Sequence, residues 1–156
     1  MKGSLTIVGL GPGAPELITP AVTDALKDST DIVGYSKYIE RVKDASGKSF
    51  HPSDNREEID RAELSINLAL QGKKVVVVSS GDPGVFAMAS AIFEVVDKKN
   101  ISIDDLSIVV LPGITALLAA SARLGAPIGH DFCVINLSDN LKSCLLYTSD
   151  AADEGS

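Results

Sequence analysis

The chain has 156 residues, of which 45% are hydrophobic and 22% charged, and its formal net charge is −7 at pH 7. This composition is typical of a globular domain and excludes a disordered or fibrous protein, while the acidic balance argues against a nucleic-acid-binding surface. No apolar stretch reaches the roughly 18 residues of a membrane helix and no signal-peptide pattern opens the chain, so we expect a cytoplasmic protein that binds neither nucleic acid nor membrane.

Short β-branched runs alternate along the chain with segments that carry helix signals. The runs are too short and too continuously apolar for amphipathic helices, so they predict buried strands. In chain order we predict a strand at Leu5–Val8, a helix capped by Thr19 and begun by Pro20, a strand at Asp31–Val33, a helix within 55–72 that Gly72 ends, a strand at Lys74–Ser79, a helix over Val85–Val96, a strand at Ser107–Leu111, a helix over Thr115–Leu124 that Gly125 closes, and a strand at Phe132–Leu137. This alternation predicts an α/β fold whose mostly parallel sheet is covered by helices on both faces.

Two cysteines are present, and neither has the spacing of a zinc ligand, so we predict no metal site. Cys133 lies in the apolar run FCVINL and is predicted to be a buried thiol rather than the disulfide partner of Cys144.

Ligands of parallel α/β sheets bind beyond the carboxyl ends of the strands, and the first loop there is Gly9–Pro15. Its glycines permit close approach of the backbone to a ligand, although a tight turn without a ligand is also compatible. The loop fits a relaxed dinucleotide fingerprint with Asp31 downstream. Against a dinucleotide, Pro12 and Pro15 stand where a phosphate-binding helix should begin, and Asp31 precedes the second strand rather than following it.

The second loop, Ser79–Val85, contains an Asp-Pro-Gly turn that precedes a small and apolar segment. Backbone groups and one carboxylate suit S-adenosylmethionine (SAM), which has no phosphate that would require Lys or Arg. Asp82 is the best candidate for a side-chain contact, or alternatively stabilises its own turn or caps the next helix. The side chains of Phe86 and Met88 are predicted to lie in the core.

The third loop, Pro112–Thr115, ends a strand and places the Thr115 hydroxyl at the start of a helix. This threonine is either the N-cap of that helix, a ligand contact, or both. Near residue 142 the charge alternation, strand pattern and helix caps all disappear. Residues 143–156 resemble translated adapter sequence, so we predict that they are a non-native tail and that the natural chain continues differently.

Four blocks in one order carry a resemblance to a known family: TIVGLGPGAPELIT, DIVGYSKYI, VVSSGDPGVFAMA and LPGITALLAASARLGAPIGHDFCVINLSD. Together they resemble the tetrapyrrole methylase family, and the last two blocks are most similar to its members that methylate carbon 17 of precorrin-3B or cobalt-factor III. The resemblance implies two α/β domains around a substrate cleft, SAM at their interface, and a homodimer. Residues 1–112 would form the N-terminal domain, and residues 113–142 a linker helix and the first strand of a truncated second domain.

The resemblance also implies roles for individual residues of this chain. The expected SAM contacts are Gly9, Pro12, Gly81, Asp82, Val85, Thr115 and Ala116. The expected substrate contacts are Tyr35, Lys37 and His51, although Lys37 is alternatively a solvated surface lysine. The expected proton-transfer residues are His130 and Asp131, although His130 is alternatively an ordinary surface histidine.

The expected function is therefore SAM-dependent methylation of a corrin precursor at carbon 17, with ring contraction, in cobalamin biosynthesis. S-adenosylhomocysteine (SAH) would be the product of the methyl donor, and the substrate would be cobalt-containing or metal-free. Three alternatives stay open: a related methyltransferase acting on another acceptor such as uroporphyrinogen, a truncated SAM-binding module without activity, and a dehydrogenase.

Overall fold

The computed structural model describes residues 2–42, 47–102 and 104–136. Within these residues five strands form one sheet in the order β3-β2-β4-β1-β5, and every pairing is parallel. The strands are β1 (Ser4–Gly9), β2 (Asp31–Tyr35), β3 (Ser49–Ser53), β4 (Lys74–Ser79) and β5 (Ser107–Leu111). The helices are α1 (Pro20–Asp28), α2 (Ser36–Ile39), α3 (Glu58–Leu70), α4 (Met88–Lys98) and α5 (Ala116–Leu124), with 3-10 turns η1 (Pro15–Leu17) and η2 (Glu40–Val42).

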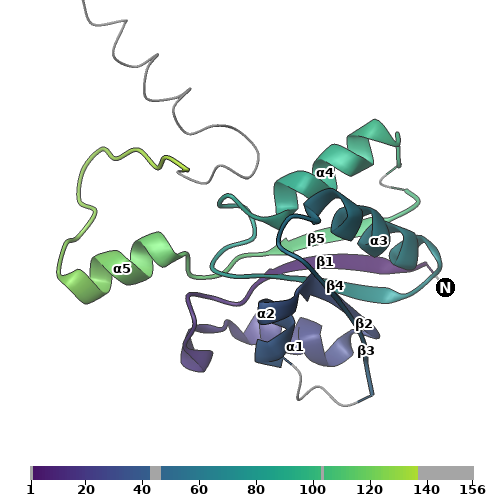
Figure 1. Cartoon of the computed structure of the whole chain (residues 1–156), viewed down its shortest axis with the longest axis horizontal. Coiled ribbons are helices and arrows are strands. Elements are labelled where there is room, and N and C mark those ends of the chain that lie inside the picture. The colour runs from purple at the N-terminus through teal and green to yellow at the C-terminus, as the bar shows by residue number, and fades with distance from the viewer. Residues whose placement is uncertain (1, 43–46, 103, 137–156) are drawn as a thin grey trace, which may run out of the picture.

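Helices α1 and α2 lie on one face of the sheet and α3 and α4 on the other, which confirms the predicted α/β architecture (Figure 1). Successive residues of a strand point to opposite faces, and β4 illustrates the result. Val75 and Val77 pack in the core beneath α3 and α4, whereas Val76 and Val78 pack in the core beneath α1 and α2. A strand buried on both faces must be apolar throughout, which is why β4 could be recognised from the sequence. The prediction of a buried strand is wrong for β5, which forms an edge of the sheet and exposes Val109 and Val110.

Local signals placed most helices correctly. The Thr19 hydroxyl accepts a hydrogen bond from the Val22 amide at 3.4 Å, as expected of the N-cap of α1. Helix α3 ends two residues before Gly72, whose φ of +89° is suited to glycine. Helix α4 begins at Met88 rather than at the predicted Val85, and residues 85–87 belong to the preceding loop.

Strand β3 was not predicted. Its sequence, SFHPS, has no apolar run and contains a proline, and it forms the edge of the sheet beside β2. An edge strand is exposed on one side, so it needs less apolar sequence and tolerates Pro52, which lacks an amide donor. Only the tertiary pairing reveals it.

The prediction of a strand at Phe132–Leu137 is wrong for the described residues 132–136, which are irregular. A strand requires a neighbour for its backbone hydrogen bonds, and none of the five strands pairs with this segment. Phe132 is accordingly 61% exposed, and Cys133 is exposed instead of buried, because no layer covers either side chain. Residue 137, Cys144 and the predicted non-native tail lie outside the described residues.

Helix α5 projects beyond the carboxyl ends of the strands and covers neither face of the sheet (Figure 1). None of its residues is buried, and Leu118 and Leu124 are exposed. Gly125 closes the helix with φ +63°, as predicted.

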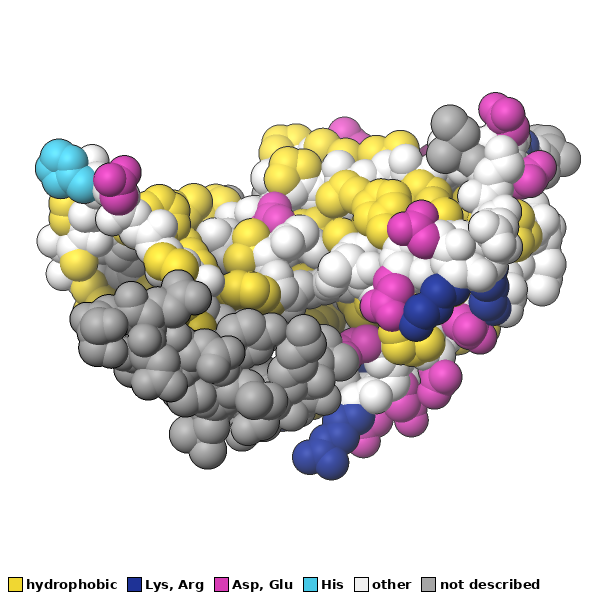
Figure 2. Space-filling model, turned by 90° about the horizontal axis from the view of Figure 1, so that it is seen from above, with side chains coloured by type: hydrophobic (Ala, Val, Ile, Leu, Met, Phe, Trp, Pro, Cys, Tyr) yellow, Lys and Arg dark blue, Asp and Glu magenta, His cyan; other side chains and the backbone are white. Residues whose placement is uncertain are grey.

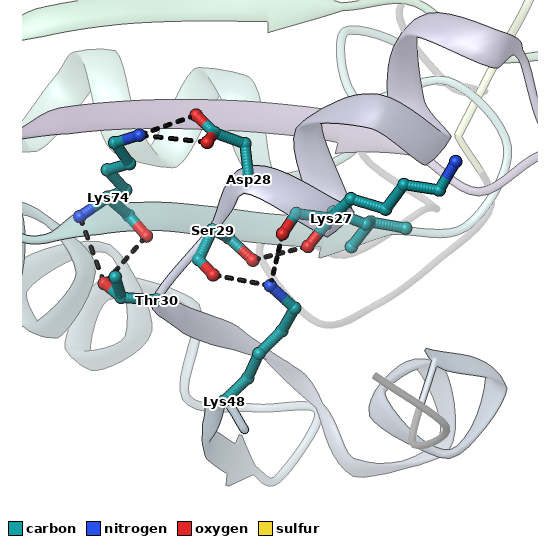
Figure 3. Close-up of polar contacts among 7 residues, drawn as sticks. Lys27, Asp28, Ser29, Thr30, Lys48 and Lys74 are labelled. Atoms are coloured by element: carbon teal, nitrogen blue, oxygen red, sulfur yellow. Dashed lines mark hydrogen bonds and ion pairs between the residues drawn. The ribbon is translucent and has the colours of Figure 1, made fainter. Parts of the chain in front are cut away.

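At the amino ends of the strands, polar contacts connect α1 with the neighbouring strands (Figure 3). The Lys48 ammonium donates a hydrogen bond to the Ser29 carbonyl at 2.5 Å, and Lys74 pairs with the Asp28 carboxylate at 2.9 Å. The Thr30 hydroxyl contacts both the amide and the carbonyl of Lys74 at 3.2 Å. These contacts hold the end of α1 against the starts of β2 and β4.

Candidate functional site

Three loops meet at the carboxyl edge because β4, β1 and β5 are neighbours in the sheet. The first loop pairs with the second through two backbone hydrogen bonds between Gly11 and Gly81, at 2.9 and 3.2 Å. The Leu10 amide donates to the Ser79 carbonyl at 2.8 Å and continues this contact back toward the sheet. The loops singled out from the sequence therefore form one structural unit.

Glycines allow the three loops to pack backbone against backbone. A β-carbon added to Gly9 would lie 2.9 Å from the Gly113 α-carbon and would also clash with the Gly81 carbonyl oxygen. A β-carbon added to Gly113 would lie 2.7 Å from the Gly9 carbonyl oxygen. Neither position has room for a side chain, so the requirement for glycine is one of space rather than of turn geometry.

Asp82 holds the second and third loops together. One carboxylate oxygen accepts a hydrogen bond from the Gly84 amide at 2.8 Å, and the other accepts one from the Gly113 amide at 3.0 Å. The bond to Gly84 confirms the reading of Asp82 as a residue that stabilises its own turn. A direct contact of Asp82 with a cofactor stays a prediction.

Arg41 of η2 supports the first loop, a role the sequence did not suggest. Its guanidinium donates hydrogen bonds to the Leu10 carbonyl at 2.5 Å and the Gly11 carbonyl at 3.3 Å. No local pattern around Arg41 marks it, because its partners lie about thirty residues away in the chain.

Phe86 and Met88 behave differently, although both were predicted to lie in the core. Met88 is buried, whereas Phe86 is 58% exposed, with a φ of +50° that is unfavourable for a bulky residue. Val85 is also exposed. The second loop thus presents apolar side chains and a strained backbone at the carboxyl edge, a feature that clusters at binding sites.

Thr115 occupies the N-cap position of α5, but its side chain makes no capping hydrogen bond. A β-carbon at Gly81 would lie 3.4 Å from the Thr115 α-carbon and 3.6 Å from the Ala116 amide nitrogen. The fold therefore brings Thr115 and Ala116 against the second loop. Pro12 is half-buried in the first loop, so the candidate cofactor residues all belong to this three-loop unit.

The predicted substrate and proton-transfer residues do not lie together in one site. Tyr35 lines a cavity near the second loop, whereas Lys37 is exposed on α2. His130 and Asp131 are exposed in the irregular segment after α5. Their proton-transfer role stays a prediction, since the described residues include no contact that joins them to the three loops.

His51 points toward the amino edge of the sheet, where its Nε2 lies 2.8 Å from an oxygen of Asp31. Lys73 donates to the same oxygen at 3.0 Å, and Thr30 donates to the other at 2.8 Å. Burial favours a raised pKa for Asp31, but the hydrogen bonds from His51, Lys73 and Thr30 outweigh it and hold that pKa below its ordinary value. The position of His51 gives no support to a substrate contact.

Asp31 also argues against a dinucleotide site. It is the first residue of β2 and lies at the edge opposite the glycine loops, already bonded to its neighbours. The glycine loop leads into η1, and α1 starts only at Pro20, so no helix N-terminus adjoins the loop. Neither the ribose carboxylate nor the phosphate-binding helix is in place.

A cavity of about 310 Å³ opens between α3, the start of α4 and the carboxyl ends of β2 and β4. Its walls include Tyr35, Tyr38, Arg61, Ser79, Phe86 and Met88. Arg61 was missed in the sequence because it reads as one charged residue of an amphipathic helix, yet it is only 4% exposed.

The three-loop unit fits SAM better than it fits a phosphate-bearing cofactor. It offers backbone amides and carbonyls, one carboxylate and small residues, and the guanidinium of Arg41 is directed at loop carbonyls. Among residues 2–42, 47–102 and 104–136, no group of three potential metal ligands occurs and no helix is long and apolar enough to cross a membrane.

Comparisons with known proteins agree with this geometry. The family of tetrapyrrole (corrin/porphyrin) methylases matches residues 4–153. The precorrin-3B C(17)-methyltransferase of Sinorhizobium sp is 47% identical over 142 residues, which cover 91% of this chain and 56% of that protein. The probable cobalt-factor III C(17)-methyltransferase of Salmonella typhimurium is 39% identical and is likewise covered over 56% of its length. The chain thus spans about half the length of these relatives.

Solved structures give the same result. The crystal structure of the methyltransferase CobJ superposes with a TM-score of 0.88 at 54% identity, covering 95% of this chain and 62% of that one. The uroporphyrin-III C-methyltransferase of Thermus thermophilus, in complex with S-adenosylhomocysteine, gives a TM-score of 0.65 at 26% identity, covering 86% of this chain and 57% of that one.

Proposed function

This chain belongs to the tetrapyrrole (corrin/porphyrin) methylase family, and we propose that it carries the SAM-binding part of an enzyme that methylates carbon 17 of a corrin precursor. The observation that carries this proposal is the three-loop unit, in which glycine backbones meet around the Asp82 carboxylate. The sequence features that first suggested SAM all fall within this unit.

SAM, when bound, would supply the methyl group, and the protein would position it. Alignment of the methyl group with its acceptor and exclusion of water account for much of the acceleration in such a transfer. The backbone of the second loop and the start of α5 would hold the cofactor, with Asp82 keeping these segments in register. The proposed contacts are Gly9, Pro12, Gly81, Asp82, Val85, Thr115 and Ala116.

The acceptor is proposed from the relatives, of which the precorrin-3B and cobalt-factor III C(17)-methyltransferases are examples. Tyr35 is the proposed substrate residue that has structural support, since it lines the cavity beside the second loop. Ring contraction and the proton transfers by His130 and Asp131 remain predictions. A related acceptor is the alternative, as in the uroporphyrin-III C-methyltransferase that shares this fold.

Apolar residues exposed at the carboxyl side of the molecule support a further domain and a homodimer in the complete protein. They include Leu118 and Leu124 on α5 and Phe132 and Ile135 after it. Hydrophobic side chains also gather over α4 (Figure 2). Exposed apolar surface of this kind is typical of interfaces. We place the complete enzyme in the cytoplasm as part of the same proposal.

Calorimetric titration tests the cofactor directly. Titrating the chain with SAH and, separately, with NADH should give micromolar binding of SAH and none of NADH. Binding of NADH alone would contradict the proposal, and binding of neither would indicate an inert truncation that has lost the cofactor site. Addition of SAM and a precorrin-3B preparation, followed by mass spectrometry, then tests the acceptor through a mass gain of one methyl group.

A further inference from the structure

The cavity between α3 and α4 contains a buried positive charge that has no carboxylate partner. Arg61 makes no salt bridge with any described residue, although it is only 4% exposed. Its Nε donates to the Ser53 hydroxyl at 2.8 Å, one terminal nitrogen donates to the Asp54 carbonyl, and the other lies 3.2 Å from the Met88 sulfur. Two of these acceptors are neutral oxygens and the third is a weak acceptor.

The charged groups around Arg61 do not neutralise it by contact. Burial lowers the pKa of Arg61, while the more distant charges of Glu58 and Glu57 act in the opposite direction. Glu94, also on the cavity wall, is paired with Lys98 at 2.6 Å. A guanidinium has five N–H donors in a fixed fork suited to carboxylates. The three contacts above use three of these donors, and Arg61 is one of the residues that line the cavity.

Ser79 supplies a second, independent observation. It is the last residue of β4, it lines the same cavity and it is only 2% exposed. Its hydroxyl is a buried polar side-chain group without a hydrogen-bond partner among the described residues. Burying an unpaired hydroxyl is unfavourable, so a polar ligand group that reached Ser79 would gain a hydrogen bond that no described residue supplies.

We infer that this cavity receives a carboxylate-bearing side chain of the substrate macrocycle, with Arg61 pairing its charge and the Ser79 hydroxyl donating to it. This inference rests on the proposed function, which makes the substrate a tetrapyrrole with several carboxylate arms. A volume of about 310 Å³ admits one such arm but not the macrocycle. The ring would then lie at the mouth of the cavity, beside Phe86 and the three-loop unit.

Binding of two corrins to the full chain tests the inference. Cobyrinic acid has free acetate and propionate arms, whereas in cobinamide these arms are amides. Wild-type protein should bind cobyrinic acid more tightly, and both Ser79→Ala and Arg61→Lys should weaken that binding roughly tenfold. Neither substitution should change the affinity for cobinamide, because its amide arms carry no negative charge.

Ser65→Ala is the matched control. Ser65 is as buried as Ser79, but its hydroxyl donates to the Ala62 carbonyl at 2.8 Å. This variant should lower the Tm without affecting cobyrinic acid binding, whereas Ser79→Ala should keep or raise the Tm, because it removes an unpaired polar group. Ser79→Ala therefore remains informative even if Arg61→Lys folds poorly.

The possible outcomes separate the two proposals. The cavity inference is overturned if wild-type protein does not prefer cobyrinic acid, or if the Ser79 and Arg61 variants bind it as tightly as wild type. If this pattern holds but SAH does not bind, the cavity inference stands and the proposed cofactor site of this chain does not. If SAH binds and the pattern is absent, the reverse conclusion follows.

Discussion

The carboxylate of Asp82 accepts a hydrogen bond at 3.0 Å from the amide of Gly113, a residue 31 positions further along the chain. With the second bond to Gly84, this contact makes one aspartate the link between two of the three loops at the carboxyl edge. The cofactor site that we propose therefore depends on Asp82 even if its side chain never touches the cofactor.

Asp82→Ala should separate the second and third loops. Because two hydrogen bonds to a charged acceptor are lost at a partly buried site, we expect the free energy of unfolding to fall by about 2 kcal/mol. The Kd for SAH should rise by roughly tenfold or more, and calorimetry and urea denaturation measure the two effects. Asp24→Ala is the control, since Asp24 is an exposed residue with only a weak ion pair to Lys27. An Asp82→Ala protein with wild-type stability would contradict this role.

Gly113→Ala should be poorly tolerated. The added methyl group would meet the backbone oxygens of Gly9 and Gly81, and overpacking of this kind typically costs about 1–3 kcal/mol. We expect a lower Tm together with weaker SAH binding. Gly129→Ala is the matched substitution, because a β-carbon there meets no atom within 4 Å. Equal Tm values for the two variants would show that the loops can move apart without a loss of stability.

Phe86→Gly should separate stability from binding. The φ of +50° at Phe86 is unfavourable for a side chain, and relief of this strain, reduced by the entropy of glycine, should raise the free energy of unfolding by about 0.5–1 kcal/mol. The more flexible loop should bind SAH several-fold less tightly. Asn100→Gly relieves the same φ of +50° far from the site and should leave SAH binding unchanged. If Phe86→Gly bound SAH like wild type, the fixed loop geometry would have no part in the site.

Asp31 should make the stability of the protein sensitive to acid. Its pKa is lower in the folded chain than its ordinary value near 3.8. Its contribution is therefore fully present above that value and is lost as the pH falls below about 4, through the lowered pKa. Asp31→Asn should be less stable than wild type at pH 7 and should lose less stability between pH 5 and pH 2. Thermal unfolding across this range measures the difference.

Asp24→Asn serves as the reference for this pH series because Asp24 is an exposed carboxylate. It should follow the wild-type acid profile. An Asp31→Asn protein that lost stability in acid as steeply as wild type would assign the acid sensitivity to other carboxylates.

Features with a local physical cause could be predicted from the sequence. Strands β4 and β5 were predicted with their observed bounds, and the Thr19 cap and the glycine ends of α3 and α5 were also correct. Strand β4 is buried on both faces and must be apolar, β5 is apolar although it is partly exposed at the edge of the sheet, and helix termini depend on residues a few positions apart. The three glycine-bearing loops were found because each directly follows an apolar strand.

Contacts between distant segments were decided only by the tertiary structure. Edge strand β3 has no apolar run, and the predicted strand that contains Cys133 has no neighbour to pair with. The bond of Asp82 to Gly113, the burial of Arg61 and the unpaired hydroxyl of Ser79 likewise depend on which strands and helices lie side by side. The sequence alone located the loops and their need for small residues. It could not determine which polar groups would find partners, because burial and hydrogen bonding are set by residues far away in the chain.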